Sequence, residues 1–139
     1  MGYRDSYSAS VTIRCNGEAA IHSCVEAAGS FCAEAGIEGA PAARLAIIIE
    51  ELVTNIADHG GMAVGEMVEL TLRRAEGGPV SVVLSDAGIP FDPRGAPADE
   101  AIPDRGGGAG LNLVRSWAIL RDYRRESGRN RLELELPVD

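Results

Sequence analysis

The segment from Pro41 to His59 carries the strongest fold signal in the sequence. Its apolar residues recur at the i, i+3, i+4, i+7 spacing of an amphipathic helix: Leu45, Ile48, Ile49, Leu52, Val53 and Ile56. Pro41 suits the first turn of a helix, where its missing N–H costs nothing, and the glycines at 60 and 61 end the pattern. A helix with one apolar stripe must bury it against another layer, so this stripe should face a sheet.

Strand and helix patterns surround this segment. Alternating polar and apolar residues predict strands over 8–14, 67–73, 79–85, 121–126 and 131–136, the last two joined by a turn over 127–130. Helical spacing predicts a helix over 18–35, facing the core with Ile21, Val25, Ala28 and Cys32 and capped by Gly36, and a third helix over 111–120. We therefore expect one α/β (α+β) domain over 1–139: a two-layer sandwich whose mixed, mostly antiparallel sheet carries about three helices on one face.

Charge argues against direct binding of nucleic acid. The chain has a formal net charge of −8, whereas binding to a phosphate backbone depends on Lys and Arg that displace counterions. The arginines that do cluster belong to the C-terminal strand pattern: Arg121, Arg124, Arg125, Arg129 and Arg131. We interpret them as a solvated strand face.

Cysteines and hydropathy indicate a cytoplasmic, non-membrane protein. Three cysteines without a CxxC pair favour neither a disulfide scaffold nor a zinc site, so we expect reduced thiols that pack as small apolar groups. No stretch reaches the roughly 18 unbroken apolar residues of a membrane span, and the N-terminus lacks the pattern of a secretory signal.

A polar row borders the apolar stripe of the second helix. Glu51, Asn55 and His59 follow i, i+4, i+8 spacing along one flank, with Asp58 beside them. Such a row is either a solvated flank or one wall of a binding site.

Asp86-Ala87-Gly88 follows a strand pattern that looks buried. A carboxylate at a strand end is a good acceptor for the exocyclic amine of adenine, although an Asp-x-Gly after a strand is also a common turn.

Glycines from Gly106 to Gly110 open the third helix, preceded by Arg105 and followed by Leu111. Glycine lets the backbone approach a phosphate, and the N–H groups at a helix start favour an anion. The sequence is neither a P-loop nor a dinucleotide fingerprint, and a bare glycine hinge is the alternative. Prolines and glycines between 86 and 108 predict a long loop, which in a small domain indicates a lid or a binding loop.

These three motifs occur in the order and spacing of the GHKL superfamily. The chain resembles that superfamily through its N box at 51–59, its G1 box at 86–92 and its G2 box at 106–111. Within it, the Glu-x-x-x-Asn-x-x-x-His and Asp-x-Gly-x-Pro-Phe-Asp forms are similar to the serine kinases that act as bacterial anti-sigma factors. The resemblance spans essentially the whole chain and implies the Bergerat ATP-binding fold.

The resemblance also implies cofactors and roles. ATP and Mg²⁺ are the implied cofactors. Asn55 matches the Mg²⁺-holding residue, Glu51 the general base, and Asp86 the adenine-binding aspartate supported by Gly88. The nucleotide-binding positions that match the glycine-rich motif are Gly106, Gly108, Gly110 and Leu111, and Arg105 is the better placed of two loop arginines, the other being Arg94.

The implied function is that of an ATP-dependent protein serine/threonine kinase, a transferase in transcription regulation. It would phosphorylate a serine of an anti-anti-sigma-type partner and sequester a sigma factor. The alternatives are a non-catalytic ATP-binding partner-switch module and a detached ATPase domain of the histidine-kinase type. The resemblance suggests a homodimer, which none of the residues above requires.

Overall fold

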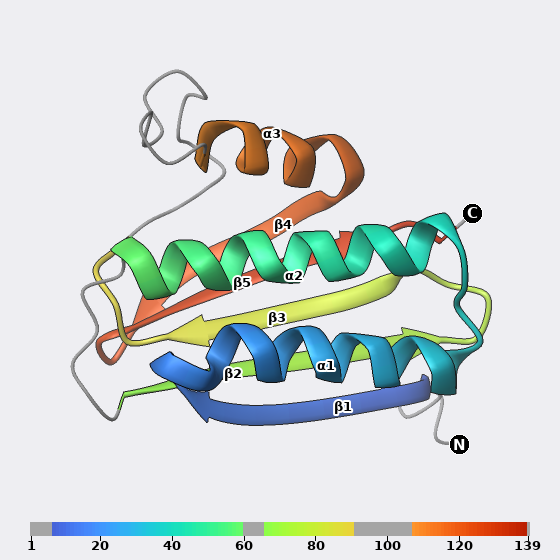
Figure 1. Cartoon of the computed structure of the whole chain (residues 1–139), viewed down its shortest axis with the longest axis horizontal. Helices are drawn as coiled ribbons and strands as arrows, with labels where there is room; N and C mark the ends of the chain where they lie inside the picture. The colour runs from blue at the N-terminus through green and yellow to red at the C-terminus, as the bar shows by residue number, and fades with distance from the viewer. Residues whose placement is uncertain (1–6, 60–65, 91–106, 139) are drawn as a thin grey trace.

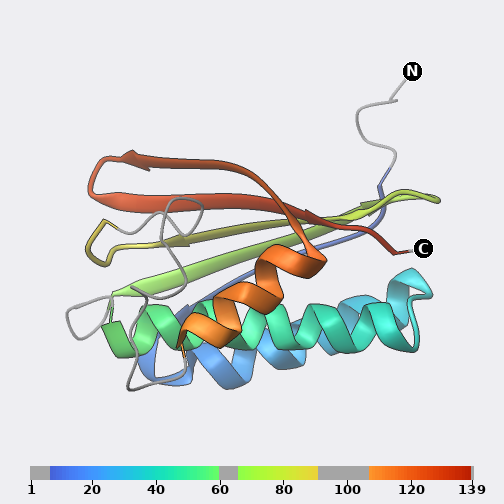
Figure 2. The same cartoon turned by 90° about the horizontal axis from the view of Figure 1, so that it is seen from above.

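The computed structural model describes residues 7–59, 66–90 and 107–138. Its elements, in chain order, are β1 (Tyr7–Asn16), α1 (Gly17–Ala35), α2 (Ala40–His59), β2 (Met67–Ala75), β3 (Val80–Asp86), α3 (Gly107–Trp117), β4 (Ile119–Glu126) and β5 (Arg129–Leu136). The strands form one sheet in the order β1-β2-β3-β5-β4, and every neighbouring pair is antiparallel. All of the described helices cover the same face of this sheet (Figures 1 and 2). The predicted two-layer arrangement is therefore confirmed, with a sheet that is wholly antiparallel over the described strands.

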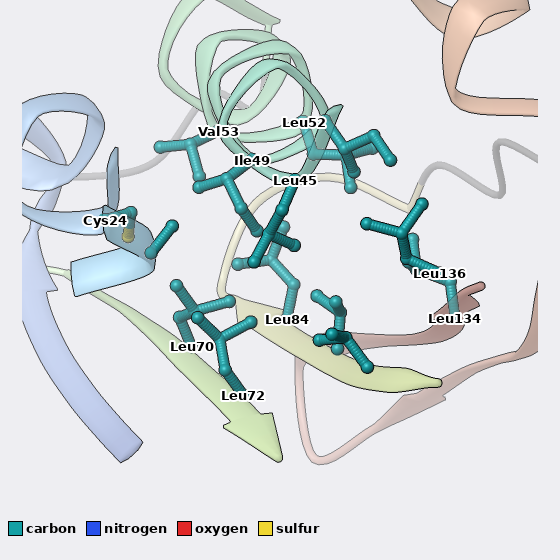
Figure 3. Packing of buried hydrophobic residues seen from close by; sticks show 14 of the residues in the cluster. Cys24, Leu45, Ile49, Leu52, Val53, Leu70, Leu72, Leu84, Leu134 and Leu136 are labelled. Atoms are coloured by element: carbon teal, nitrogen blue, oxygen red, sulfur yellow. The ribbon is translucent and has the colours of Figure 1, made fainter. Parts of the chain in front are cut away.

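The core lies between α2 and the inner face of the sheet. Five of the six stripe residues predicted on α2 are buried, and the sixth, Ile56, is half-buried. Across from them lie alternate strand residues, namely Leu70, Leu72, Val82, Leu84, Leu134 and Leu136. Figure 3 shows the α2 side chains directed at those of the strands. The stripe and the strand alternation were thus sufficient to predict the core.

Helix α1 buries only part of the face predicted for it: Ala28 and Cys32 are buried as expected, but Ile21 and Val25 are not. Ala20, Cys24, Ala28 and Phe31 are at most 1% exposed, whereas Ile21 and Val25 are only half-buried. Small side chains allow a helix axis to lie closer to its neighbours, so the alanine face packs inward and the β-branched residues lie at its border. The predicted cap is confirmed, because Gly36 is left-handed at φ 73° and its N–H donates to the Cys32 carbonyl.

The C-terminal boundaries also differ from the prediction. Helix α3 spans Gly107–Trp117 instead of 111–120, because Ile119 and Leu120 pair with β5. The hairpin turn shrinks from four residues to two, since only Ser127 and Gly128 have positive φ, at 53° and 77°. Positive φ at both central residues is typical of the type I′ turn, whose twist matches that of paired strands. This assignment moves Asn130 from a turn into the sheet.

Candidate functional site

Helix α3 lies antiparallel on α2, with two contacts that fix the alignment. Near the start of α3, Gly110 lies against the side chain of Glu51, and near its end Trp117 lies under the Arg44 guanidinium at 5.6 Å from the ring centroid. Arg44 to Glu51 and Gly110 to Trp117 each span seven residues, or two helical turns. The alignment therefore places the N-terminal part of α3 beside the polar flank of α2.

At Gly110, α3 lies so close to α2 that no side chain fits between them. A Cβ atom at this position would collide with the Glu51 carboxylate and lie 3.1 Å from its Cγ. The next residue, Leu111, is 2% exposed and anchors the helix in the core. The structure thus brings together Glu51 and Gly110, both named from the sequence. A glycine at position 110 therefore has a second role besides phosphate access, because it leaves room for the Glu51 carboxylate.

Asn55 lies one helical turn beyond Glu51 on the same flank of α2. Both side chains are half-buried, whereas Asp58 is exposed. At Glu51 and Asn55 the polar row therefore lies between the buried stripe and solvent. Side chains in this place can contact a ligand without filling the core. The side chain of His59 lies outside the description.

Asp86 ends β3 as a buried carboxylate that is 6% exposed. Its Oδ1 accepts two hydrogen bonds, from the Gly88 N–H at 2.7 Å and from Asn130 Nδ2 at 3.1 Å. Among the described residues, no donor contacts its Oδ2, and no buried polar side-chain atom of that part of the chain lacks a partner. The two bonds to Oδ1 fix the orientation of the Asp86 carboxylate. The predicted Asp-x-Gly turn is present, with Gly88 as its donor.

Asn130 is a residue of this site that sequence reasoning missed. It is 5% exposed, pairs with Asp86 across the β3–β5 ladder, and donates from Nδ2 also to the Ile89 carbonyl at 2.8 Å. Its Oδ1 accepts from the Tyr123 hydroxyl at 2.5 Å and from Arg125 Nη1 at 3.0 Å. A buried amide with this many partners fixes both the Asp86 carboxylate and the turn that follows it. A signal existed, since Asn130 continues the inward row of Leu132, Leu134 and Leu136.

The arginines of the hairpin divide into two groups. Arg121, Arg124 and Arg131 form ion pairs on the exposed sheet surface, which agrees with a solvated strand face. The other two also bond to distant segments, although Arg125 is exposed and Arg129 is half-buried. Arg125 donates to the Gly88 carbonyl at 2.6 Å, and Arg129 donates to Ser85 Oγ and to the Met67 carbonyl. Arg125 therefore belongs to the surroundings of the Asp86 turn, because it lies opposite Asn130 in the β4–β5 ladder.

The ends of two helices and one strand lie at the same end of the molecule. The C-terminal ends of α2 and β3 and the N-terminal end of α3 lie on the same side in both views (Figures 1 and 2). Gly108 lies in the first turn of α3, while Arg94, Arg105, Gly106 and most of the predicted lid lie outside the described residues. The chemistry of these groups fits Mg·ATP: a carboxylate suits an amine, a helix start suits phosphates, and the Asn55 amide oxygen is a hard ligand of the kind Mg²⁺ takes.

Comparison with known families agrees with this arrangement. Residues 16–136 match the histidine kinase-like ATPase domain, which is 121 of the 139 residues of the chain. The chain belongs to this family. The match includes all three motifs and both helices that meet at Gly110, and it supports ATP binding. No curated protein matches the sequence.

Two solved structures show the same fold. One is the histidine kinase domain of a blue-light activated histidine kinase from Erythrobacter litoralis EL346, with 21% identity, a TM-score of 0.50 and 88% of this chain covered. This chain spans only 61% of that domain. The other is the SiaB-SiaC complex from Pseudomonas aeruginosa, with 18% identity, a TM-score of 0.53, and coverage of 96% of this chain and 91% of that one. At these identities the likeness concerns the fold.

No helix in the described ranges is long and apolar enough to cross a membrane.

Proposed function

We propose that this chain is an ATP-dependent protein serine kinase that phosphorylates a small anti-anti-sigma-type partner and sequesters a sigma factor. The observation that carries the proposal is the contact of the Glu51 carboxylate with Gly110 near the start of α3, together with the buried Asp86 carboxylate at the end of β3. Membership in a family of ATPase domains supports the nucleotide. A fold relative solved as a complex of two proteins supports a protein partner.

Each nucleotide-binding role falls to a residue with suitable chemistry. Asp86 accepts a hydrogen bond from the adenine amine through Oδ2, because Oδ1 is already held by Gly88 and Asn130. The start of α3, with Arg105, Gly106 and Gly108 in sequence before Gly110, binds the phosphates through backbone N–H groups and positive charge. Asn55 holds Mg²⁺ through its amide oxygen. When bound, Mg·ATP supplies the phosphoryl group and the charge neutralisation that its transfer requires.

Glu51 is the general base in this proposal. Its carboxylate lies against Gly110 and is half-buried, so it is reachable from the phosphate-binding end of α3 without being free in solvent. A carboxylate in that place accepts the proton of a serine hydroxyl and so activates the oxygen for attack. The contact with Gly110 holds the carboxylate beside the start of α3.

Titration calorimetry with Mg·ATP tests the nucleotide site. We expect wild-type protein to bind Mg·ATP, Asp86→Ala to lose most of the affinity, and Asn55→Ala to lose the Mg²⁺-dependent part while the circular dichroism stays native. Asp58→Ala is the matched control, since Asp58 is an exposed carboxylate on the same helix. Wild-type affinity in folded Asn55→Ala would refute its role, and no binding by wild-type protein would refute the site.

Transfer of labelled phosphate to an anti-anti-sigma-type protein tests the kinase. Glu51→Gln keeps the shape of the side chain but removes the base, so we expect Mg·ATP binding to persist and transfer to fall by about 10² to 10⁴-fold. Full transfer by Glu51→Gln would exclude Glu51 as the base. Complex formation without phosphoserine in the wild-type reaction would instead establish a binding-only partner-switch module.

A further inference from the structure

Two of the three cysteines lie together at the corner where β1 turns into α1. The Sγ atoms of Cys15 and Cys24 are 3.9 Å apart. Cys15 continues the inward row of β1 and is half-buried, and Cys24 lies on the buried face of α1 with no exposed surface. Asn16 lies between them in the chain and caps α1 by accepting from the Ala19 N–H at 3.3 Å. The pair is therefore held in register by secondary structure on both sides.

We propose that Cys15 and Cys24 form an oxidation site, at which a peroxide converts the dithiol into an intramolecular disulfide that ties β1 to α1. The two sulfurs must approach by about 1.9 Å, from 3.9 Å to the roughly 2.0 Å of a disulfide. Rotation of Cys15 about its own side-chain bonds is available for this movement, because that side chain is not enclosed. The proposal is independent of the nucleotide site.

The order of the two chemical steps follows from burial. Burial, followed in size by repulsion from Cys15, raises the pKa of Cys24 to about 12, so Cys24 stays a protonated thiol at neutral pH. The partly exposed Cys15 is consequently the sulfur that meets the oxidant.

The reaction balances with one peroxide. The Cys15 sulfur attacks one peroxide oxygen, the O–O bond breaks, and the products are a sulfenic acid on Cys15 and one water. The Cys24 sulfur then attacks the Cys15 sulfur, the S–O bond breaks, and the hydroxyl leaves as a second water with the Cys24 proton. Two thiols are oxidised to one disulfide while hydrogen peroxide is reduced to two waters.

Cys32 provides an internal control. It lies two helical turns beyond Cys24 on the same helix and is 5% exposed, and in the described part of the chain no other sulfur contacts it. Burial raises the pKa of this thiol as well. A third thiol with similar burial but no neighbouring sulfur separates the effect of proximity from the general reactivity of buried cysteines.

The experiment treats the reduced full chain with an equimolar amount of hydrogen peroxide and then counts free thiols under denaturing conditions. We expect the count to fall from three to one, with a mass loss of about 2 Da, a cross-linked peptide pair containing Cys15 and Cys24, and full reversal by dithiothreitol. The bond closes a short loop, so we expect the oxidised form to melt roughly 5–10 °C higher.

Variants locate the bond. Cys32→Ala should still lose two thiols, whereas Cys15→Ser should lose none to an intramolecular bond and Cys24→Ala should stop at a mixed or over-oxidised Cys15. Three thiols surviving in the wild-type chain, a bond that includes Cys32, or a lower melting temperature after oxidation would each overturn the proposal. The wild-type measurement decides the matter even where a variant fails to fold.

Discussion

Helix α2 is flanked by two helices that meet it in different ways. Helix α1 presents an apolar face of small residues and one aromatic ring, in which Cys24 and Phe31 are at most 1% exposed. Helix α3 meets α2 through Glu51 against Gly110 and Arg44 over Trp117, contacts that involve charged groups. We call these the α1 seam and the α3 seam. Under the proposed function the α1 seam stabilises the fold and the α3 seam takes part in the chemistry, so substitutions in the two seams should have separable effects.

The largest expected effect is on the buried stripe of α2. Ile49→Ala should lower the free energy of unfolding by about 2–5 kcal/mol, because it removes buried methyl groups and leaves a cavity. Ile47 is two positions away and 37% exposed, and Ile47→Ala should change stability by no more than about 0.5 kcal/mol. Urea unfolding measures both. Equal losses for the two variants would mean that the stripe is not the core.

The α3 seam should respond in function and not in stability. In Gly110→Ala the new methyl group displaces the Glu51 carboxylate, which is the far end of a flexible side chain, so the fold should survive. Phosphoryl transfer should fall by at least about 10²-fold, as expected when a general base is moved.

Gly29→Ala is the matched control, because an added Cβ at this α1 position meets nothing within 4 Å. It should leave transfer unchanged and raise stability by about 0.5–1 kcal/mol through helix propensity. Normal transfer by Gly110→Ala would contradict the assignment of the α3 seam to catalysis.

A smaller effect is expected at the Asp86 turn. Asn130→Ala removes the donors to Asp86 and to the Ile89 carbonyl, so stability should fall by about 1–3 kcal/mol and Mg·ATP affinity by roughly 10-fold. Arg131→Ala changes the next residue of β5, which forms a partly exposed ion pair with Glu133, and should leave both quantities nearly unchanged. Calorimetry measures the Mg·ATP affinity of the two variants, and urea unfolding measures their stability. Unchanged affinity in folded Asn130→Ala would show that Asp86 does not need the hydrogen bond from Asn130.

The smallest expected effect lies at the far end of the α3 seam. Arg44→Ala removes the cation over Trp117 and should cost about 0.5–1 kcal/mol of stability. Trp117 is the single tryptophan of the chain, so its emission reports the docking of α3 directly. Arg73→Ala removes the corresponding contact with Tyr7 at the other edge of the sheet and should leave that emission unchanged. An identical emission spectrum in Arg44→Ala would mean that Trp117 does not sense this contact.

The sequence predicted the features that depend on local pattern. The apolar stripe of α2 and the strand alternation identified the core, and the Asp-x-Gly turn was placed correctly because its Gly88 N–H bond is local. Family resemblance named both Glu51 and Gly110 as site residues, but their direct contact was not predicted. The roles of the site residues stay proposals, as does the folding of residues 1–139 as a single domain.

The features that escaped prediction depend on contacts between distant segments. Asn130 was taken for a turn residue, because its pairing with Asp86 follows from the β3–β5 register, which no local pattern determines. Arg125 is exposed, as expected of a solvated strand face, but its hydrogen bond to a partner 37 positions away was not predicted. On α1 the predicted core residues Ile21 and Val25 are only half-buried, because the face that a helix buries depends on how it packs against the other elements.

The junction between α3 and β4 is short. Only Ala118, which is 7% exposed and whose N–H donates to the Val114 carbonyl, separates the end of the helix from the first residue of the strand. The C-terminal end of α3 is thus joined closely to β4. At 1.5 Å per residue, the 11 residues of the helix extend roughly 16 Å from that junction. Trp117 therefore lies beside the junction with β4, whereas Gly107 is the residue of the helix farthest along the chain from it.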